Sequence, residues 1–187
     1  MHALPLLASA IAIIGNAVPI DDWKDNQEYA RMVKDIGVDN YAAHLGLHGE
    51  QKQIFDDLVG SFAKEEISLQ ELLQKMEKAT PAAYRTLSAL LEDYRTRVAA
   101  VQSEEAREYL LEAERALLDI PLAMTLYKEG LISLEDRNTR IVSAMIQTSF
   151  MLLKTRLPAR REIVGLFPEA MPYLVVAGVR PHKLLTQ

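Results

Sequence analysis

Helix-start signals divide the chain from residue 50 onward into short segments whose apolar residues recur at helical spacing. Residues 68–71 read Ser-Leu-Gln-Glu, a capping box in which the Ser hydroxyl accepts the third amide and the Glu reaches back. Residues 80–81 read Thr-Pro, which places a capping hydroxyl before a proline at the first helical position. Residues 103–105 and 133–136 each begin with a serine followed by acidic side chains, which suit the positive end of a helix dipole.

The segments between these signals predict the fold class. β-Branched residues form no alternating runs, so nothing in the pattern favours strands. Pro121 is expected to kink or break its helix, because proline lacks the amide and clashes with the preceding turn. The helix that follows Ser133 has a broad apolar arc and is expected to lie centrally. We therefore predict an all-α domain with helices over 50–63, 69–80, 81–101, 104–120, 122–130, 134–156 and 158–167.

Composition excludes several classes of function. The 187 residues include no cysteine, which removes disulfides, thiolate catalysis, Cys-ligated zinc and iron–sulfur clusters. The net charge of −5 argues against non-specific nucleic-acid binding, which requires basic surface. No phosphate-binding loop, His-Glu-x-x-His or nucleophile-elbow motif is present, so we expect neither an enzyme nor a cofactor. His44 and His48 offer only two ligands in a glycine-containing stretch, so no metal is expected.

The first seventeen residues predict secretion. Residues 1–17 contain no Lys, Arg, Asp or Glu, and residues 4–14 are an apolar run too short to span a membrane. Gly15 and Ala17 supply the small residues of a cleavage site before Val18. The alternative is a buried N-terminal helix. With the signal peptide removed, residues 18–176 are expected to form a single helical domain and residues 177–187 a C-terminal tail.

Apolar residues cover more than one stripe on several of the predicted helices. Such an excess either fills an ordinary core or lines an internal apolar cavity, and the residues alone leave both interpretations open. Arg156, Arg160 and Arg161 lie at the junction of two late helices. A cation at the mouth of an apolar cavity would suit a carboxylate ligand, whereas the alternative is that these are exposed arginines at helix ends.

Four stretches occur in an order that resembles one family. Residues 68–84 combine a capped helix, a Thr-Pro break and a following tyrosine, and residues 87–91 read Leu-x-x-Leu-Leu. Residues 98–107 read Val-Ala-Ala-Val-Gln-Ser-Glu-Glu-Ala-Arg, and residues 166–168 read Leu-Phe-Pro. From residue 38 to residue 176 the chain thereby resembles the nematode fatty-acid- and retinol-binding proteins, which are secreted, cysteine-free, all-helical lipid carriers. The chain departs from the family pattern most over residues 122–140.

The resemblance implies a wedge-like bundle of mostly antiparallel helices around an internal apolar cavity that binds fatty acids and retinol without catalysis. It also implies transient contact with membrane surfaces during lipid transfer, with no obligate protein partner. The alternative is a secreted helical interaction module that has no lipid ligand. If there is a cavity, the inward faces of the predicted helices supply its lining: Leu87, Leu91, Tyr94, Val98, Leu110, Leu117, Met145, Leu152 and Phe167.

We expect the ligand's head group to lie near the Pro158 break. Arg156 and Arg160 flank this break, with Lys154 close by, and a helix junction opens more easily than a packed helix face. A buried carboxylate without a partner is costly, so a fatty acid must place its head group beside a cation or in water. Arg156 is the better of the two candidates.

Overall fold

The computed structural model of the protein describes residues 45–168, and the secondary structure there consists of α-helices with no strand among them. The predicted all-α class is therefore confirmed for this part of the chain. The predicted signal peptide, the cut before Val18, His44 and the tail at 177–187 lie outside the described residues. The helices in chain order are α4 (Gly49–Ala63), α5 (Leu69–Ala79), α6 (Pro81–Ala100), α7 (Glu104–Leu117), α8 (Asp119–Lys128), α9 (Leu134–Lys154) and α10 (Leu157–Leu166).

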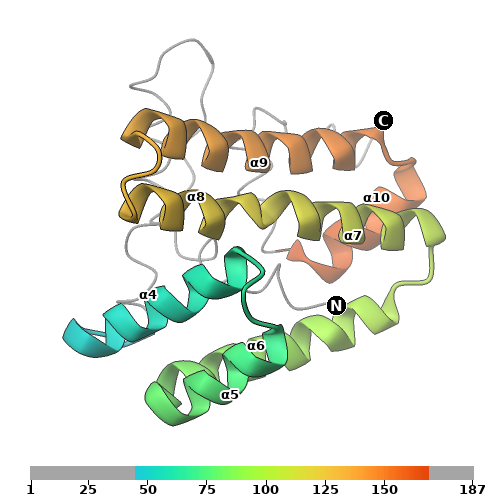
Figure 1. Ribbon diagram of the computed structural model, residues 1–187. Helices are drawn as coiled ribbons and strands as arrows, with labels where there is room; N and C mark the ends of the chain where they lie inside the picture. Colours follow the sequence, from blue (N-terminus) through green and yellow to red (C-terminus); the bar gives the residue numbers. More distant parts are fainter. Residues whose placement is uncertain (1–44, 169–187) are drawn as a thin grey trace.

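Helices α7, α8 and α9 form one layer, α5 and α6 form a hairpin, and α4 and α10 lie between the layer and the hairpin (Figure 1). Helices α7 and α8 follow one another along one line, and α9 packs on both while running in the opposite direction. Helices α5 and α6 form the hairpin, and α4 packs on both α5 and α8. Helix α10 turns back from the end of α9 and packs on α7. Helix α6 packs its backbone most closely on α5, and it diverges from α7 beyond the turn that joins them.

Two predicted capping boxes form as expected. The Ser68 hydroxyl accepts the Glu71 amide at 3.2 Å, and the Glu71 carboxylate accepts the Ser68 amide at 2.8 Å. Ser133 and Asp136 exchange the same two hydrogen bonds, at 3.0 and 3.2 Å. Ser103 accepts the N3 amide of α7. Each cap satisfies amides that have no partner within the helix, and this fixes where α5, α7 and α9 begin.

The predicted hydroxyl cap at Thr80 is wrong. Its hydroxyl donates to the Met76 carbonyl at 3.3 Å, so it satisfies the end of α5 and not the start of α6. Pro81 occupies the first turn of α6, where a missing amide costs nothing, and sets the start of that helix.

The helix expected over 104–120 ends earlier than its spacing predicts. Helix α7 ends at Leu117 and α8 begins at Asp119, so Pro121 lies in the first turn of α8. This is where proline is tolerated, because its missing amide would have no partner in the helix anyway. The predicted break is therefore confirmed, but it falls ahead of the proline. Gly130, at φ 73°, then adopts the left-handed conformation that reverses the chain towards α9.

Helices α4 and α8 approach each other closely at one glycine. A Cβ atom on Gly60 would lie 2.9 Å from Cγ2 of Thr125, which is closer than real side chains pack. The Thr125 hydroxyl donates to the Pro121 carbonyl at 2.9 Å, which holds its side chain in place. Only glycine at position 60 permits this helix separation.

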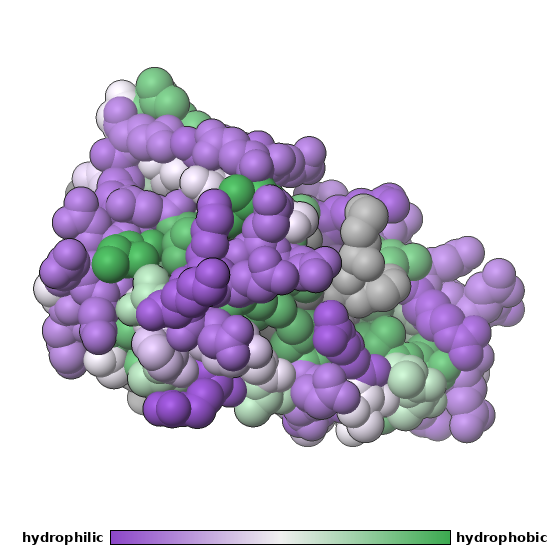
Figure 2. All heavy atoms as spheres, turned by 60° about the horizontal axis from the view of Figure 1, so that its bottom comes forward, coloured by the Kyte–Doolittle hydropathy of each residue, from purple (hydrophilic) through white to green (hydrophobic). Residues whose placement is uncertain are grey.

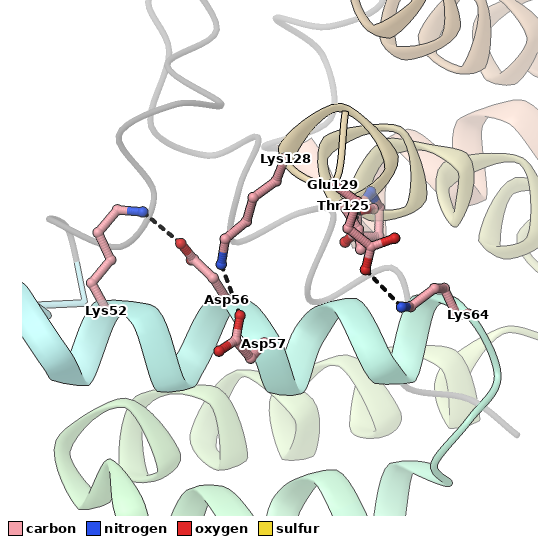
Figure 3. A network of polar contacts seen from close by, with 8 residues as sticks. Lys52, Asp56, Asp57, Lys64, Thr125, Lys128 and Glu129 are labelled. Carbon is pink, nitrogen blue, oxygen red and sulfur yellow. Dashed lines mark hydrogen bonds and ion pairs between the residues drawn. The ribbon is translucent and has the colours of Figure 1, made fainter. Parts of the chain in front are cut away.

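Ion pairs flank the same crossing (Figure 3). Lys128 on α8 donates to Asp57 on α4 at 2.8 Å, and Lys64 donates to Glu129 at 2.7 Å. These side chains remain partly or largely accessible to water, so each pair contributes little to stability. The pairs set the alignment of α4 on α8 more than the stability of the contact.

The buried apolar residues fall into two clusters. The first cluster joins α4, α5, the first half of α6, α8 and the first half of α9, and its larger members are Leu47, Phe55, Val59, Phe62, Leu72, Met76, Leu87, Ile120, Ile141, Val142 and Met145. The second cluster joins the second half of α6 to α7, α10 and the end of α9, and it comprises Leu91, Tyr94, Val101, Ala106, Tyr109, Leu110, Ala113, Leu152, Ala159, Ile163 and Phe167. Helix α9 contributes to both clusters and packs its backbone mainly on α7 and α8, so it links the two clusters, while its predicted central position stays a prediction.

Candidate functional site

The residues predicted to line a cavity lie inside the molecule but are divided between the two clusters. Leu87 and Met145 are buried in the first cluster, and Leu117 is half-buried against it. The other predicted lining residues belong to the second cluster or pack against it: Leu91, Tyr94, Val98, Leu110, Leu152 and Phe167. Helix α6 therefore faces both clusters, with Leu87 in one and Leu91 a single turn later in the other. Whether these side chains contact a ligand stays a prediction.

The second cluster contains a buried polar pair that the sequence did not single out. The Tyr94 hydroxyl on α6 donates to Oε1 of Glu114 on α7 at 2.6 Å, and both residues are buried. Burial, followed by the hydrogen bond to Glu114, raises the pKa of Tyr94 far above its ordinary value. The hydroxyl therefore keeps its proton and serves as the donor. Burial likewise raises the pKa of neighbouring Tyr109.

The burial of Glu114 could have been predicted from its helical spacing relative to two leucines, which searches of composition and motifs do not consider. Glu114 lies four residues after Leu110 and three before Leu117, so a helix places all three side chains on one face. Both leucines were predicted to point inward, and the carboxylate between them follows the same geometry. A charged residue on an apolar stripe is a candidate functional group, because its burial is costly unless it is hydrogen-bonded.

Helix α10 closes the end of the second cluster. The Phe167 ring lies 5.6 Å from the Tyr94 ring, centroid to centroid. Arg97 reaches across from α6, donates to the Leu166 carbonyl at 3.0 Å and stacks on Phe167 at 5.9 Å. These side-chain contacts link α6 to α10. The α6 backbone itself packs most closely on α5.

The carboxylate of Glu162 ties α10 to the turn between α6 and α7. It accepts the amides of Gln102 and Ser103, at 2.5 and 3.1 Å. Both donors lie in the turn that precedes α7, so the carboxylate also lies near the positive end of that helix dipole.

The two predicted head-group arginines occupy different environments. Arg156 is largely solvent-exposed and pairs with Glu105, whose carboxylate accepts its amide at 2.7 Å and its Nε at 2.8 Å. The Arg156 amide, followed by its guanidinium, lowers the pKa of Glu105. Arg160 is buried and donates to the carbonyls of Leu153 and Thr155, both at 2.6 Å. Arg160 therefore caps the end of α9, and Arg156 is the one with an exposed charge at the junction.

Other kinds of site find little support in the part of the chain that the structure describes. No group of three His, Cys, Asp or Glu residues there has the proximity that a metal ion requires. His48 precedes α4 and makes no capping hydrogen bond. Among the same residues, no helix has the length and apolar content needed to cross a bilayer.

Comparison of the chain with protein-family models gives no match. Comparisons with curated proteins and with solved structures likewise give none.

Proposed function

We propose that this protein is a secreted carrier that holds fatty acids and retinol among the apolar side chains of its helical bundle, without catalysis. The observation that carries the proposal is the position of α6. Its buried side chains join both apolar clusters, with Leu87 in the first and Leu91 and Tyr94 in the second, while its backbone packs most closely on α5 and has only weak backbone contact with α7. A helix that borders both clusters through its side chains is suited to admit an acyl chain among them.

The energetics of apolar burial favour a ligand of this kind. An alkyl chain that leaves water gains about 0.8 kcal/mol per buried CH2, so a long-chain lipid binds tightly with few polar contacts. Most of the residues predicted to line the site are aliphatic, and those of the second cluster adjoin the aromatic pair Tyr94 and Phe167. The helix starts and breaks that carry the family resemblance also lie at helix ends in the structure: Ser68, Pro81, Ser103 and Phe167.

Hydrophobic side chains reach the surface between hydrophilic ones on one face of the molecule (Figure 2). Figure 2 views the molecule from the side that lies at the bottom of Figure 1, and hydrophilic side chains cover most of this face. Hydrophobic side chains emerge between them in narrow strips. For a fatty acid, the exposed charge of Arg156 at the α9–α10 junction would keep the carboxylate near water.

A specific observation also favours the alternative, a helical interaction module. Leu131, Leu134 and Phe150 are between 49% and 67% exposed, and Tyr127 and Leu111 are about 40% exposed. Exposed apolar side chains that gather on one surface mark contact sites with partners or lipid surfaces. The two functions differ in whether a small lipid binds to the isolated protein.

A titration with a fluorescent fatty-acid analogue tests the proposal. The mature protein is first delipidated, and its folding is verified by circular dichroism. We expect a saturable blue shift of the probe that oleate and retinol both reverse. A folded protein that gives no shift contradicts the carrier function and leaves the interaction module as the better account.

A further inference from the structure

Helices α7 and α10 each supply a carboxylate to the start of the other. Glu105, in the first turn of α7, accepts the backbone amide of Arg156, the residue that begins α10, at 2.7 Å. Glu162, on α10, accepts the amides of Gln102 and Ser103, which precede α7, at 2.5 and 3.1 Å. Amides at a helix start have no partner within the helix, so this exchange satisfies groups that are otherwise open.

Helix α10 depends on the exchange more than α7 does. Helix α7 also has a cap of its own, because the Ser103 hydroxyl accepts the Ala106 amide. The side chain of Arg156, at the corresponding position of α10, makes no capping hydrogen bond. The acceptor for the start of α10 therefore comes from α7, and separation of the two helices removes it.

The sequence of α10 makes it a weak helix by itself. It has ten residues, among them Gly165 and the β-branched pair Ile163 and Val164. Helices shorter than about 12 residues are marginal in water, and glycine and β-branched residues lower helix propensity further. Docking on α7 therefore keeps α10 helical more than its own sequence does.

The packing of α10 is limited as well. Its buried residues are Ala159, Arg160 and Ile163, so a single large aliphatic side chain of this helix is buried. Beyond its end, Phe167 packs against Tyr94. Among the described helices, the backbone of α10 packs mainly on α7 (Figure 1). Elements that bury few apolar side chains open at a lower free energy than the whole molecule.

We propose that α10 is a hinged cover, which is helical only while docked on α7 and opens as one unit to admit lipid to the second cluster. The lipid in this inference rests on the proposed carrier function. Opening removes Ile163 and Phe167 from the second cluster and exposes the apolar side chains that they cover. The hinge is the bend between α9 and α10, where Thr155 and Arg156 both have extended backbone.

Amide hydrogen exchange in the folded wild-type protein at pH 7.4 tests the opening. A helix that opens as one unit gives a common protection level to its amides, here those of residues 161–166. We expect this level to be at least about tenfold below that of the α7 amides. Equal protection in α10 and α7 would show that α10 separates only when the whole protein unfolds, and this result would overturn the proposal.

Substitution at either end of the carboxylate exchange should favour the open form. Glu105→Gln and Glu162→Gln keep the size of the side chain and remove the charge that strengthens its hydrogen bonds. Each should speed exchange throughout α10 by about fivefold to tenfold and leave α4 and α5 unchanged. Glu104→Gln removes a charge from an exposed position in the same turn of α7 and should not affect α10.

The pattern of acceleration distinguishes a cover from an ordinary stabilising contact. Equal acceleration in every helix would mean that the variants lose global stability, and it would overturn the proposal. If a variant fails to fold by circular dichroism, the comparison of α10 with α7 in the wild type still decides.

Retinol binding kinetics connect the opening to the carrier function. Retinol is uncharged, so a change in charge near Arg156 does not alter its binding directly. Glu162→Gln should raise the association and dissociation rates of retinol by the same factor as the α10 exchange, with the affinity unchanged. Unchanged rates despite faster exchange would reject α10 as the route for lipid. If the folded wild type binds no retinol, the carrier function and the lipid route both fail, whereas the exchange data still decide whether α10 opens as one unit.

Discussion

At the scale of single residues, Gly60 fixes how closely two helices approach. In Gly60→Ala the new methyl group would meet Cγ2 of Thr125, which is a stiff, β-branched side chain and is held by its bond to Pro121. Overpacking of this kind costs about 1–3 kcal/mol, whereas the gain in helix propensity is about 1 kcal/mol or less. We expect a net loss of about 1 kcal/mol in the free energy of unfolding, measured by urea denaturation.

The same contact provides its own control. Thr125→Ser removes Cγ2 and keeps the hydroxyl, so the double variant Gly60→Ala, Thr125→Ser should recover part of the loss. A double-mutant cycle with no coupling between the two positions would show that the helices adjust freely, contrary to this account.

The two arginines at the α9–α10 junction should behave differently. Arg156→Gln removes an exposed charge and should weaken oleate binding while leaving retinol affinity unchanged, because retinol has no charge. Because the Arg156 side chain is largely exposed to water, the loss for oleate should be about 1 kcal/mol or less. Arg160→Gln should instead lower stability, because its guanidinium satisfies the Leu153 and Thr155 carbonyls. Competition titrations of Arg156→Gln with oleate and retinol check the first effect. If the affinities for both ligands fall equally, Arg156 is only a surface charge and does not bind the head group.

At the scale of one element, the capping box of α5 predicts a pH dependence. The Ser68 amide and then its hydroxyl lower the pKa of Glu71 below its ordinary value of 4.5. Because the folded pKa is the lower one, this contribution to stability is complete above the unfolded pKa and is lost as the pH falls through the folded pKa. Glu71→Gln should therefore be less stable than the wild type at pH 7, with the difference shrinking below about pH 4.

Thermal unfolding followed from pH 3 to pH 7 measures this effect. Glu77→Gln, at an exposed position of the same helix, is the matched control and should show no such trend. Ser68→Ala removes the hydroxyl cap itself and should cost about 1 kcal/mol at pH 7. A pH-independent difference for Glu71→Gln would mean that its carboxylate makes no contribution to the cap.

The sequence predicts these elements well because their boundaries are set by local chemistry. The start of α9 follows from Ser133 and its acidic partner, and the start of α6 follows from Pro81, without any knowledge of the tertiary structure. Thr80 shows the limit of such reasoning. Its hydroxyl has two backbone partners within reach, and only the chain path beyond α5 decides that it bonds to Met76.

At the scale of the whole molecule, helical periodicity predicts which residues are buried but not which cluster they join. Leu87 and Leu91 share one stripe of α6, yet they belong to different clusters because other helices cover each half of α6. Glu114 was passed over for a related reason, since a charged residue is assigned to the solvent-exposed face by default. Its burial depends on α6 and α10 closing over α7, which is a tertiary property.

Bulky substitutions test whether each cluster admits a ligand. Leu91→Trp fills space in the second cluster and Met145→Trp does so in the first. If these positions line the binding region, each variant should bind less lipid while its circular dichroism stays that of a folded helical protein. If both variants unfold, the clusters are close-packed core, in which overpacking costs about 1–3 kcal/mol.

Isothermal titration of the delipidated protein with oleate, at several temperatures, tests the carrier function most directly. Transfer of an acyl chain from water into the bundle buries apolar surface, and this burial gives binding a negative heat-capacity change. The account predicts saturable binding whose enthalpy becomes more favourable as the temperature rises, in a protein that unfolds cooperatively both before and after the titration. A cooperatively folded protein that produces no saturable binding heat at any of these temperatures would contradict it.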